Sequence, residues 1–321
     1  MKPLFRRRLL AGALAHTTLS PAAFRPAAFL ATFLAALRPA GAVVILDSTW
    51  RAEGGRHGRE SEGFGAHEAL ARQPQFASVV ALSEDDGETW GEASGTWIGN
   101  MGIGNMGSAG VVLTSGHNFE PGEGADNYLY RSSGGTVRRG VRLDTNPFYN
   151  RSNEERSGFD AAIVRLDGPV TDAGPPPALY AGRDELDKQI VMVGHGMRGI
   201  GSVGESDLYN SPSGRAAAAT NVIDALLDAI VPPPKGADGG NWLQVTLRRE
   251  SEGAGRLDGL LGSGDSGGSA WMRSERFGWV IVGINANGTG KATYGEHSEF
   301  ARVSGLRDWI LRLAPGARAV G

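Results

Sequence analysis

The chain has 321 residues, 40% of them hydrophobic and 21% charged, which is the composition of a globular protein with enough apolar residues for a large core. Its formal net charge of −3 gives no indication of a nucleic-acid partner or of an anionic membrane surface. The absence of cysteine excludes disulfides, thiolate metal sites and a cysteine nucleophile.

The first 42 residues have the layout of an export signal. Basic residues at positions 2 and 6–8 precede apolar stretches that run to residue 37, and Ala40-Gly41-Ala42 supplies small residues at A-x-A spacing. We therefore expect cleavage after about Ala42 and an exported protein, either secreted or periplasmic. The apolar stretch is shorter than the ~20 residues of a membrane span, so we expect membrane contact only if the signal stays uncleaved as an anchor.

The remaining chain divides into three kinds of segment. Residues 43–75 are rich in Gly, Glu and Arg with little periodicity, which predicts a loosely structured N-terminal extension or propeptide. From residue 76 onward, short apolar runs of strand length are separated by turn residues: 76–82, 95–99, 109–114, 161–166, 189–194, 242–247 and 278–284. They predict an antiparallel all-β barrel or sandwich. The proline-rich stretch at 174–177 indicates a linker between two halves, and residues 303–313 have the apolar spacing of a short amphipathic helix.

The pentapeptide GDSGG at residues 264–268 is a candidate turn for a serine nucleophile. A serine hydroxyl attacks a carbonyl when a base lies beside it and backbone N–H groups stabilise the oxyanion. Glycines on both sides of Ser266 allow the backbone angles and the close substrate approach that such a turn requires. In a chain with 49 glycines the pentapeptide is also compatible with an ordinary turn, so its interpretation depends on a base and an acid elsewhere.

The base and acid candidates are His117 and Asp160. His117 follows the apolar run at 109–114, at the end of an expected strand, from which its side chain can reach across a cleft. A histidine at a strand end is by itself more often structural. Asp160 opens the apolar run at 161–166, where an unpaired buried carboxylate is strongly unfavourable and an imidazole N–H is a suitable partner. We therefore expect the two side chains to interact.

Together these segments resemble the chymotrypsin-like (trypsin-fold) serine peptidase family, in a cysteine-free bacterial-type form. LTSGH at 113–117 is similar to the family's LTAAH, DAAIVRL at 160–166 is similar to its DIALLRL, and GDSGG is the family's sequence around the serine. Further similarities are GHG at 194–196, VGI at 282–284, FARV at 300–303 and DWI at 308–310. The order His, Asp, Ser is also that of the family.

The resemblance implies a fold of two six-stranded antiparallel β-barrels, with the catalytic cleft between them and a short C-terminal helix. It implies a peptidase domain at 76–313, with one barrel at about 76–178, the second at about 186–300 and the closing helix at 303–313. The implied activity is that of a serine endopeptidase that cleaves polypeptides through an acyl-enzyme. We expect a monomer that needs no cofactor or metal ion.

The family's catalytic roles carry over to matching positions. His117 would act as the general base, Asp160 would orient its imidazole, and Ser266 would attack the peptide carbonyl. The backbone N–H groups of Gly264 and Ser266 would form the oxyanion hole.

Two positions depart from the family pattern. Asp265 matches a carboxylate that pairs with a newly freed N-terminal ammonium and supports the oxyanion loop, but no IVGG-like start identifies that amine here. Asn118 replaces the half-cystine that usually follows the histidine, so packing alone is expected to position His117.

Specificity depends on three matched positions. Leu260, followed by Leu261, stands six residues before Ser266, where trypsin-like members have an acid at the base of the pocket. Asn287 replaces a tryptophan on the cleft-lining strand, and Ser298 matches a pocket-wall glycine. A basic side chain would leave its charge unpaired among such residues, so we expect a pocket for small or apolar side chains.

Two other functions remain open. GDSGG also fits the G-x-S-x-G turn of an α/β-hydrolase esterase, but that fold requires the order Ser, Asp, His, and His297 is the one histidine after the serine. The other alternative is a catalytically inactive, exported β-barrel binding module that has kept the motifs.

Overall fold

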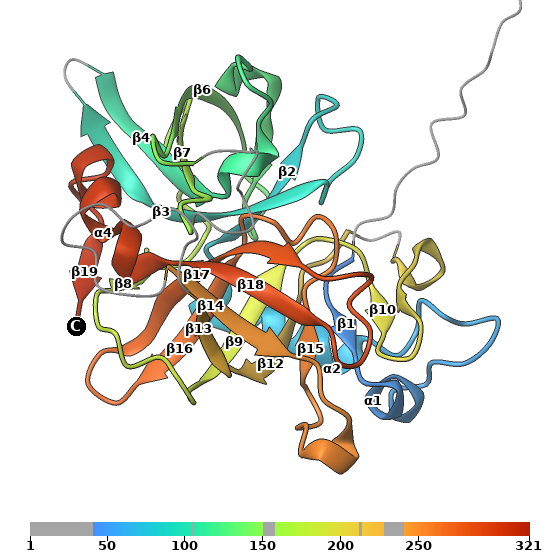
Figure 1. The fold of residues 1–321 in the computed structure, drawn as a ribbon. Helices are drawn as coiled ribbons and strands as arrows, with labels where there is room; N and C mark the ends of the chain where they lie inside the picture. Colours follow the sequence, from blue (N-terminus) through green and yellow to red (C-terminus); the bar gives the residue numbers. More distant parts are fainter. Residues whose placement is uncertain (1–40, 104–105, 150–157, 212–213, 228–240) are drawn as a thin grey trace, which may run out of the picture. The chain divides into compact units, whose positions relative to one another are not determined.

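Short apolar runs that end in turn residues form many of the strands, and the strands build two halves that belong to one compact unit (Figure 1). The structure, a computed structural model, describes residues 41–103, 106–149, 158–211, 214–227 and 241–321. The expected export signal lies outside the described residues, except for Gly41 and Ala42.

The first half is a closed barrel of six strands, paired in the order β2-β3-β4-β7-β6-β5. The strands are β2 (Val79–Ser83), β3 (Ala93–Ile103), β4 (Met106–Thr114), β5 (Leu129–Arg131), β6 (Val137–Thr145) and β7 (Ala162–Leu166). All neighbouring pairs are antiparallel. Val80, Leu82, Val112 and Val164 are among the buried side chains of its core.

The second half is a sheet of nine strands, seven of which are paired in the order β12-β9-β16-β17-β18-β14-β13. The seven are β9 (Gln189–Gly194), β12 (Ala217–Val222), β13 (Ala225–Leu227), β14 (Trp242–Thr246), β16 (Ser269–Ser274), β17 (Gly278–Gly288) and β18 (His297–Arg302). The other two are β8 (Ala178–Tyr180), which pairs in parallel with β17, and β19 (Arg318–Val320), which pairs in parallel with β8.

The predicted all-β class is confirmed, but the second half curves as a half-barrel instead of closing with six strands. At its open side, Nδ2 of Asn221 in β12 donates to the backbone oxygen of Thr246 in β14 at 3.2 Å and to that of Gly259 at 2.9 Å. A side chain thus spans the place where a strand pairing would close the barrel. β8 begins at Ala178 and belongs to this sheet.

The segment at 43–75 is not loosely structured, which corrects the expectation from its composition. Residues 43–46 are all apolar and fully buried, and β1 (Val44–Ile45) is a central strand of a small sheet with the order β11-β10-β1-β15. Its partners are β10 (Gly199–Ile200), β11 (Gly204–Glu205) and β15 (Gly259–Leu260). Two helices follow, α1 (Asp47–Ala52) and α2 (Gly65–Ala71). Trp50 and Phe64 pack edge-on against Tyr209, so this segment belongs to the body of the fold.

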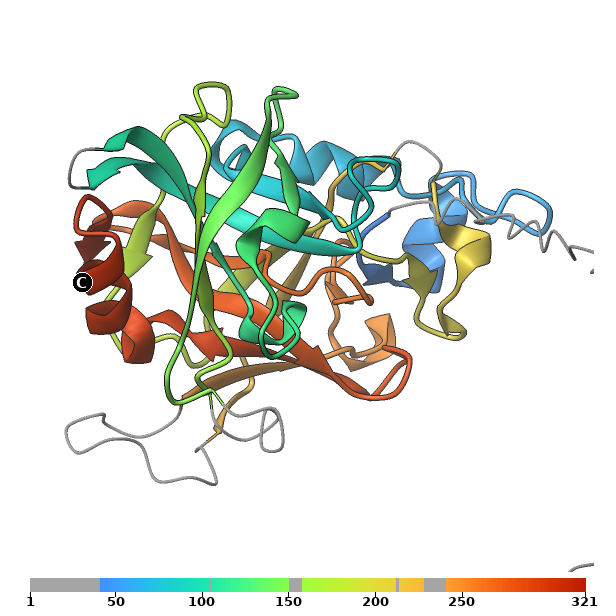
Figure 2. The same ribbon diagram turned by 90° about the horizontal axis from the view of Figure 1, so that it is seen from above.

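The closing helix α4 (Val303–Leu313) has the predicted bounds and buries Val303, Leu306 and Ile310. It lies on the side of the fold opposite to α1 (Figures 1 and 2). Short 3-10 turns complete the described elements: η1 (Pro74–Phe76), η2 (Gly116–Asn118), η3 (Ala125–Asn127), η5 (Asp207–Tyr209) and η6 (Glu250–Glu252). Among the described helices, none combines the length and apolar character of a membrane span.

Candidate active site

Two neighbouring strands of the first barrel bring His117 and Asp160 together. Thr114 at the end of β4 is opposite Ala162 at the start of β7, so the chain after β4 and the chain before β7 meet at one end of the barrel. Oδ1 of Asp160 accepts a hydrogen bond from the backbone N–H of His117 at 2.9 Å, and Oδ2 lies 2.6 Å from its Nδ1. Because a carboxylate only accepts, a neutral imidazole carries its proton on Nδ1 and keeps a lone pair on Nε2. The ring is thus oriented to accept a proton at Nε2.

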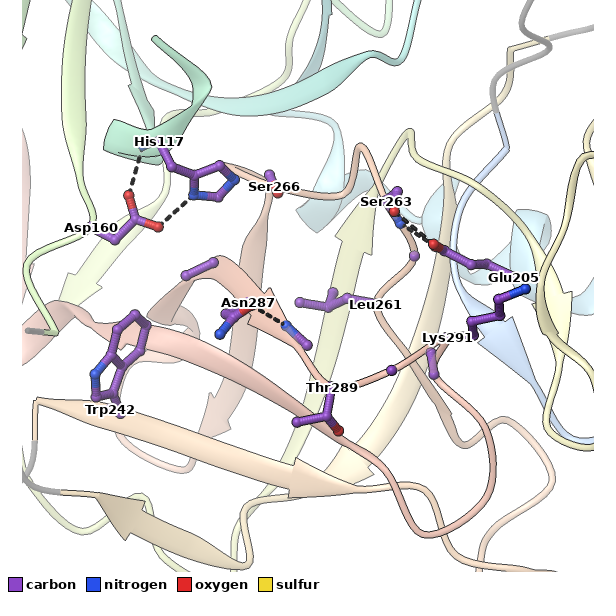
Figure 3. Close-up of a pocket in the computed structure, with 15 residues that line it drawn as sticks. His117, Asp160, Glu205, Trp242, Leu261, Ser263, Ser266, Asn287, Thr289 and Lys291 are labelled. Atoms are coloured by element: carbon purple, nitrogen blue, oxygen red, sulfur yellow. Dashed lines mark hydrogen bonds and ion pairs between the residues drawn. The ribbon is translucent and has the colours of Figure 1, made fainter. Parts of the chain in front are cut away.

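Ser266 lies in the loop between β15 and β16 and faces this pair. Figure 3 shows the imidazole of His117 between Asp160 and Ser266, and the three residues line one cavity. Gly267 has a φ of +85°, and a Cβ there would lie 2.0 Å from Oγ1 of Thr114. The glycine therefore lets the serine loop approach the first barrel closely.

Polar contacts from the first barrel hold the Ser266 loop. The backbone N–H of Ser94 donates to the backbone carbonyl oxygen of Ser266 at 2.8 Å. Oγ of Ser94 donates to the backbone carbonyl oxygen of Gly264 at 2.9 Å. Nδ2 of Asn118 donates to Oγ1 of Thr114 at 3.0 Å and to the backbone oxygen of Ser266 at 3.2 Å. Asn118 therefore joins the histidine segment to the serine loop, and the expectation that packing alone positions His117 is wrong.

The backbone N–H groups of the loop divide into two sets. Three of them donate to backbone carbonyl oxygens: Asp265 to Gly262 at 3.0 Å, Gly267 to Asn285 at 2.7 Å and Gly268 to Asp265 at 3.0 Å. Within the described part of the chain, the N–H groups of Gly264 and Ser266 donate to no protein acceptor. These two donors are the ones expected for an oxyanion hole, and the loop leaves both available.

The carboxylate of Asp265 is fully buried beneath the loop. Its Oδ1 accepts from the N–H of Gly196 at 2.8 Å, and its Oδ2 accepts from the N–H groups of Gly262 at 2.8 Å and Val43 at 3.2 Å. Burial raises the pKa of Asp265 from its ordinary 3.8 to about 7, although these hydrogen bonds act in the opposite direction. Asp265 thus joins three backbone N–H groups beneath the loop, and the N–H of Val43 is a donor that the sequence could not name.

The cavity beside Ser266 has a volume of about 250 Å³. Besides the catalytic candidates, its lining includes Leu261, Asn287 and the two alanines at 286 and 292. Of the three expected pocket residues, Asn287 lines the cavity. Leu260 and Ser298 are fully buried and do not line it. Leu260 pairs with Val44 in the small sheet, and Oγ of Ser298 accepts from the N–H of Leu261 at 3.0 Å, so both lie behind the wall.

Sequence reasoning missed Glu205 and Ser263, which border the same cavity (Figure 3). The carboxylate of Glu205 accepts from the backbone N–H of Ser263 at 2.6 Å and from its Oγ at 2.7 Å. Ser263 directly precedes Gly264, an expected oxyanion donor, so this contact fixes the start of the serine loop. No local motif marks Glu205, which lies in the short strand β11.

A second cavity, of about 300 Å³, opens on another side of Ser266. Its lining includes Glu84, Glu92, Glu120 and Glu123. The pKa of Glu84 is raised by burial and by the charges of Glu92 and Glu123. This side of Ser266 therefore carries a cluster of acidic side chains.

His297, the histidine considered for the esterase alternative, lies at the start of β18. Its Nδ1 is 2.9 Å from Oγ1 of Thr246, and it lines neither cavity that contains Ser266. Among the described residues, no cluster of three or more His, Asp or Glu side chains could hold a metal ion. In comparisons with known proteins, no family model and no curated protein sequence matches this chain.

Proposed function

We propose that this chain is an exported serine endopeptidase of the chymotrypsin-like kind. The observation that carries the proposal is the hydrogen-bonded pair of His117 and Asp160 beside Ser266 in one cavity. The side chain of Asp160 is 2% exposed and that of His117 is 27% exposed, so the acid is shielded while the base can reach a substrate. The esterase alternative requires alternating strands and helices, which the β-rich fold contradicts.

Each residue has a role that follows from its contacts. Nε2 of His117 takes the proton of Ser266 Oγ as that oxygen bonds to a peptide carbonyl carbon, and then gives the proton to the leaving amine. Asp160 holds the Nδ1–H tautomer and stabilises the imidazolium. The N–H groups of Gly264 and Ser266 bind the oxyanion, where loss of one donor typically costs about 3 kcal/mol. Water activated by the same imidazole then hydrolyses the acyl-enzyme.

We further propose that the primary pocket prefers small or apolar side chains. Leu261, Ala286 and Ala292 supply apolar surface to the cavity. Glu205 also borders it, but two donors of Ser263 already occupy its carboxylate. Cleavage-site profiling on a peptide library is expected to return small or apolar residues before the scissile bond. A preference for Arg or Lys would overturn this specificity.

A covalent phosphonate that reacts with activated serines tests the catalytic assignment. We expect it to label the processed protein at Ser266, and to label neither Ser266→Ala nor His117→Ala. The exposed Ser251 provides the matched control, because Ser251→Ala should label as the parent does. Absence of labelling in correctly folded, processed protein would favour the inactive binding module.

A further inference from the structure

The peptide unit between Ser263 and Gly264 carries one of the two expected oxyanion donors. A trans peptide is planar, and its N–H and C=O groups point in opposite directions. The backbone oxygen of Ser263 accepts a hydrogen bond from the N–H of Met197 at 2.6 Å. The N–H of Gly264 therefore points away from Met197, so the orientation of this one peptide decides whether the donor is available to an oxyanion.

The backbone around this peptide leaves it free to rotate. Rotation changes ψ of Ser263 and φ of Gly264, and a glycine tolerates a wide range of φ. Gly264 has a φ of +91°, in the left-handed region, and Ser263 is also preceded by a glycine. The backbone alone therefore does not fix the peptide, and contacts from other segments must hold it.

The side chain of Glu205 provides such a contact at the residue before the donor. Its Oε2 accepts from the backbone N–H of Ser263 at 2.6 Å, and its Oε1 accepts from Oγ of the same residue at 2.7 Å. Figure 3 shows the carboxylate facing Ser263 at the edge of the cavity that also contains Ser266. Two contacts to one residue fix both its backbone nitrogen and the direction of its side chain.

The backbone of Glu205 is itself anchored to the wall of this cavity. Its N–H donates to the backbone oxygen of Lys291 at 2.8 Å, and Lys291 lines the cavity. Glu205 is also paired with Gly199 of the neighbouring strand β10. The carboxylate therefore grips Ser263 from a strand that is held on two sides.

We propose that Glu205 is a positioning residue for the oxyanion hole: by holding Ser263, it favours the orientation of the Ser263–Gly264 peptide that leaves the N–H of Gly264 available. This inference rests on the proposed function, because the donor matters only when Ser266 attacks a carbonyl. Glu205 acts through Ser263 and not on the substrate. Its loss should therefore weaken binding of the transition state and leave binding of the ground state unchanged.

The test measures labelling by the phosphonate over a range of its concentrations, which gives a maximal rate and a half-saturating concentration. For Glu205→Ala we expect the maximal rate to fall about tenfold at an unchanged half-saturating concentration. Removal of a donor costs about 10²–10³-fold, and the effect here is smaller because the donor is displaced and water can reach the exposed Ser263. The matched control is Glu275→Ala, in the exposed turn between β16 and β17, which should label as the parent does.

Glu205→Gln separates positioning from charge. The charge of Glu205 contributes to the raised pKa of Asp265, so its removal alone could alter the loop. A glutamine keeps an oxygen that accepts from the N–H of Ser263 and an amide that donates to its Oγ. We expect Glu205→Gln to label at nearly the parent rate. A rate as low as that of Glu205→Ala would assign the effect to charge and overturn the proposal.

Ser263→Ala tests the same contact from its other side, and it does so even if Glu205→Ala does not fold. It removes the Oγ contact and keeps the N–H contact, so we expect a smaller fall in the maximal rate. The double variant should be no slower than Glu205→Ala, because both contacts are already lost there. Losses that multiply, or a Ser263→Ala protein that labels as fast as the parent, would overturn the proposal.

The pH profile of labelling provides a readout that general disruption of the site would change. Glu205 makes no contact with His117 or Asp160, so the profile of Glu205→Ala should keep the midpoint of the parent. A shifted midpoint would show that the catalytic pair has moved and would overturn the assignment to the oxyanion donor.

Failure of this inference and failure of the proposed function are distinguishable. If the parent is not labelled at all, the peptidase function falls and the inference falls with it. If the parent and Glu205→Ala are labelled with the same maximal rate, the function stands and the positioning role falls.

Discussion

The buried carboxyl of Asp265 makes the free energy of unfolding depend on pH. The perturbation is Asp265→Asn. Burial raises the pKa of Asp265 from 3.8 to about 7. The folded protein then keeps a proton that the unfolded chain has released, so the free energy of unfolding falls as pH rises through this window.

The magnitude follows from the two pKa values. Each pKa unit corresponds to about 1.4 kcal/mol, so the ionised carboxyl costs the folded protein about 4 kcal/mol above pH 7, and this cost vanishes below pH 3.8. An asparagine side chain does not ionise, so the variant lacks this pH dependence.

Urea unfolding of the parent and of the Asp265→Asn variant between about pH 4 and pH 8 measures the effect. The buried His67 and His195, with pKa values lowered to about 4, change stability in the opposite direction over this range. Both histidines are present in the parent and in the variant, so their contributions cancel in the difference between the two free energies of unfolding. We expect Asp265→Asn to become less destabilising, or more stabilising, by about 4 kcal/mol from pH 4 to pH 8. A difference that does not change with pH would refute the reasoning.

Three further predictions follow from contacts elsewhere in the fold. Asp160→Asn should lower kcat/KM for peptide hydrolysis about 10⁴-fold, because an amide stabilises the wrong imidazole tautomer; unchanged turnover would contradict the assigned role. Glu185→Ala should cost about 3–5 kcal/mol in urea unfolding, because it removes a buried carboxylate that pairs with the buried Arg302, whereas Asp308→Ala, in an exposed pair, should change stability little. His67→Leu should reduce the loss of stability as pH falls from about 6.5 to about 4, since burial favours the neutral imidazole and depresses its pKa to about 4; an unaltered pH profile would exclude this histidine as the cause.

The catalytic candidates could be predicted from the sequence because each lies next to a local signal. His117 and Asp160 flank apolar runs that form the neighbouring strands β4 and β7. Ser266 lies in a turn that the flanking glycines indicate. The strands without such signals were missed. β12 (AAATNV) is rich in alanine, which has low β propensity, and its pairing with β9 holds it as a strand. β6 (VRRGVRLDT) is charged, and among its residues only Gly140 is buried.

The features that could not be predicted from the sequence depend on contacts between distant segments. The Gly, Glu and Arg content of residues 43–75 obscured the four apolar residues that begin the segment, and their burial depends on strands far along the chain. Glu205 reaches Ser263 across 58 residues, and neither residue carries a motif. Leu260 and Ser298, which were expected to line the pocket, lie behind its wall. The position of Leu260 is set by its pairing with the distant Val44.

The place of β1 in the small sheet also sets an order of events during synthesis. The nitrogen of Val43 and the carboxyl of Asp265 are 222 residues apart in the chain, and β1 pairs with β15 just before the catalytic loop. β1 therefore waits for β10 and then for β15 before both of its edges are paired. Contacts of such long range form slowly. A chain that ends before β15 leaves one edge of β1 unpaired and the N–H of Val43 without its carboxylate acceptor.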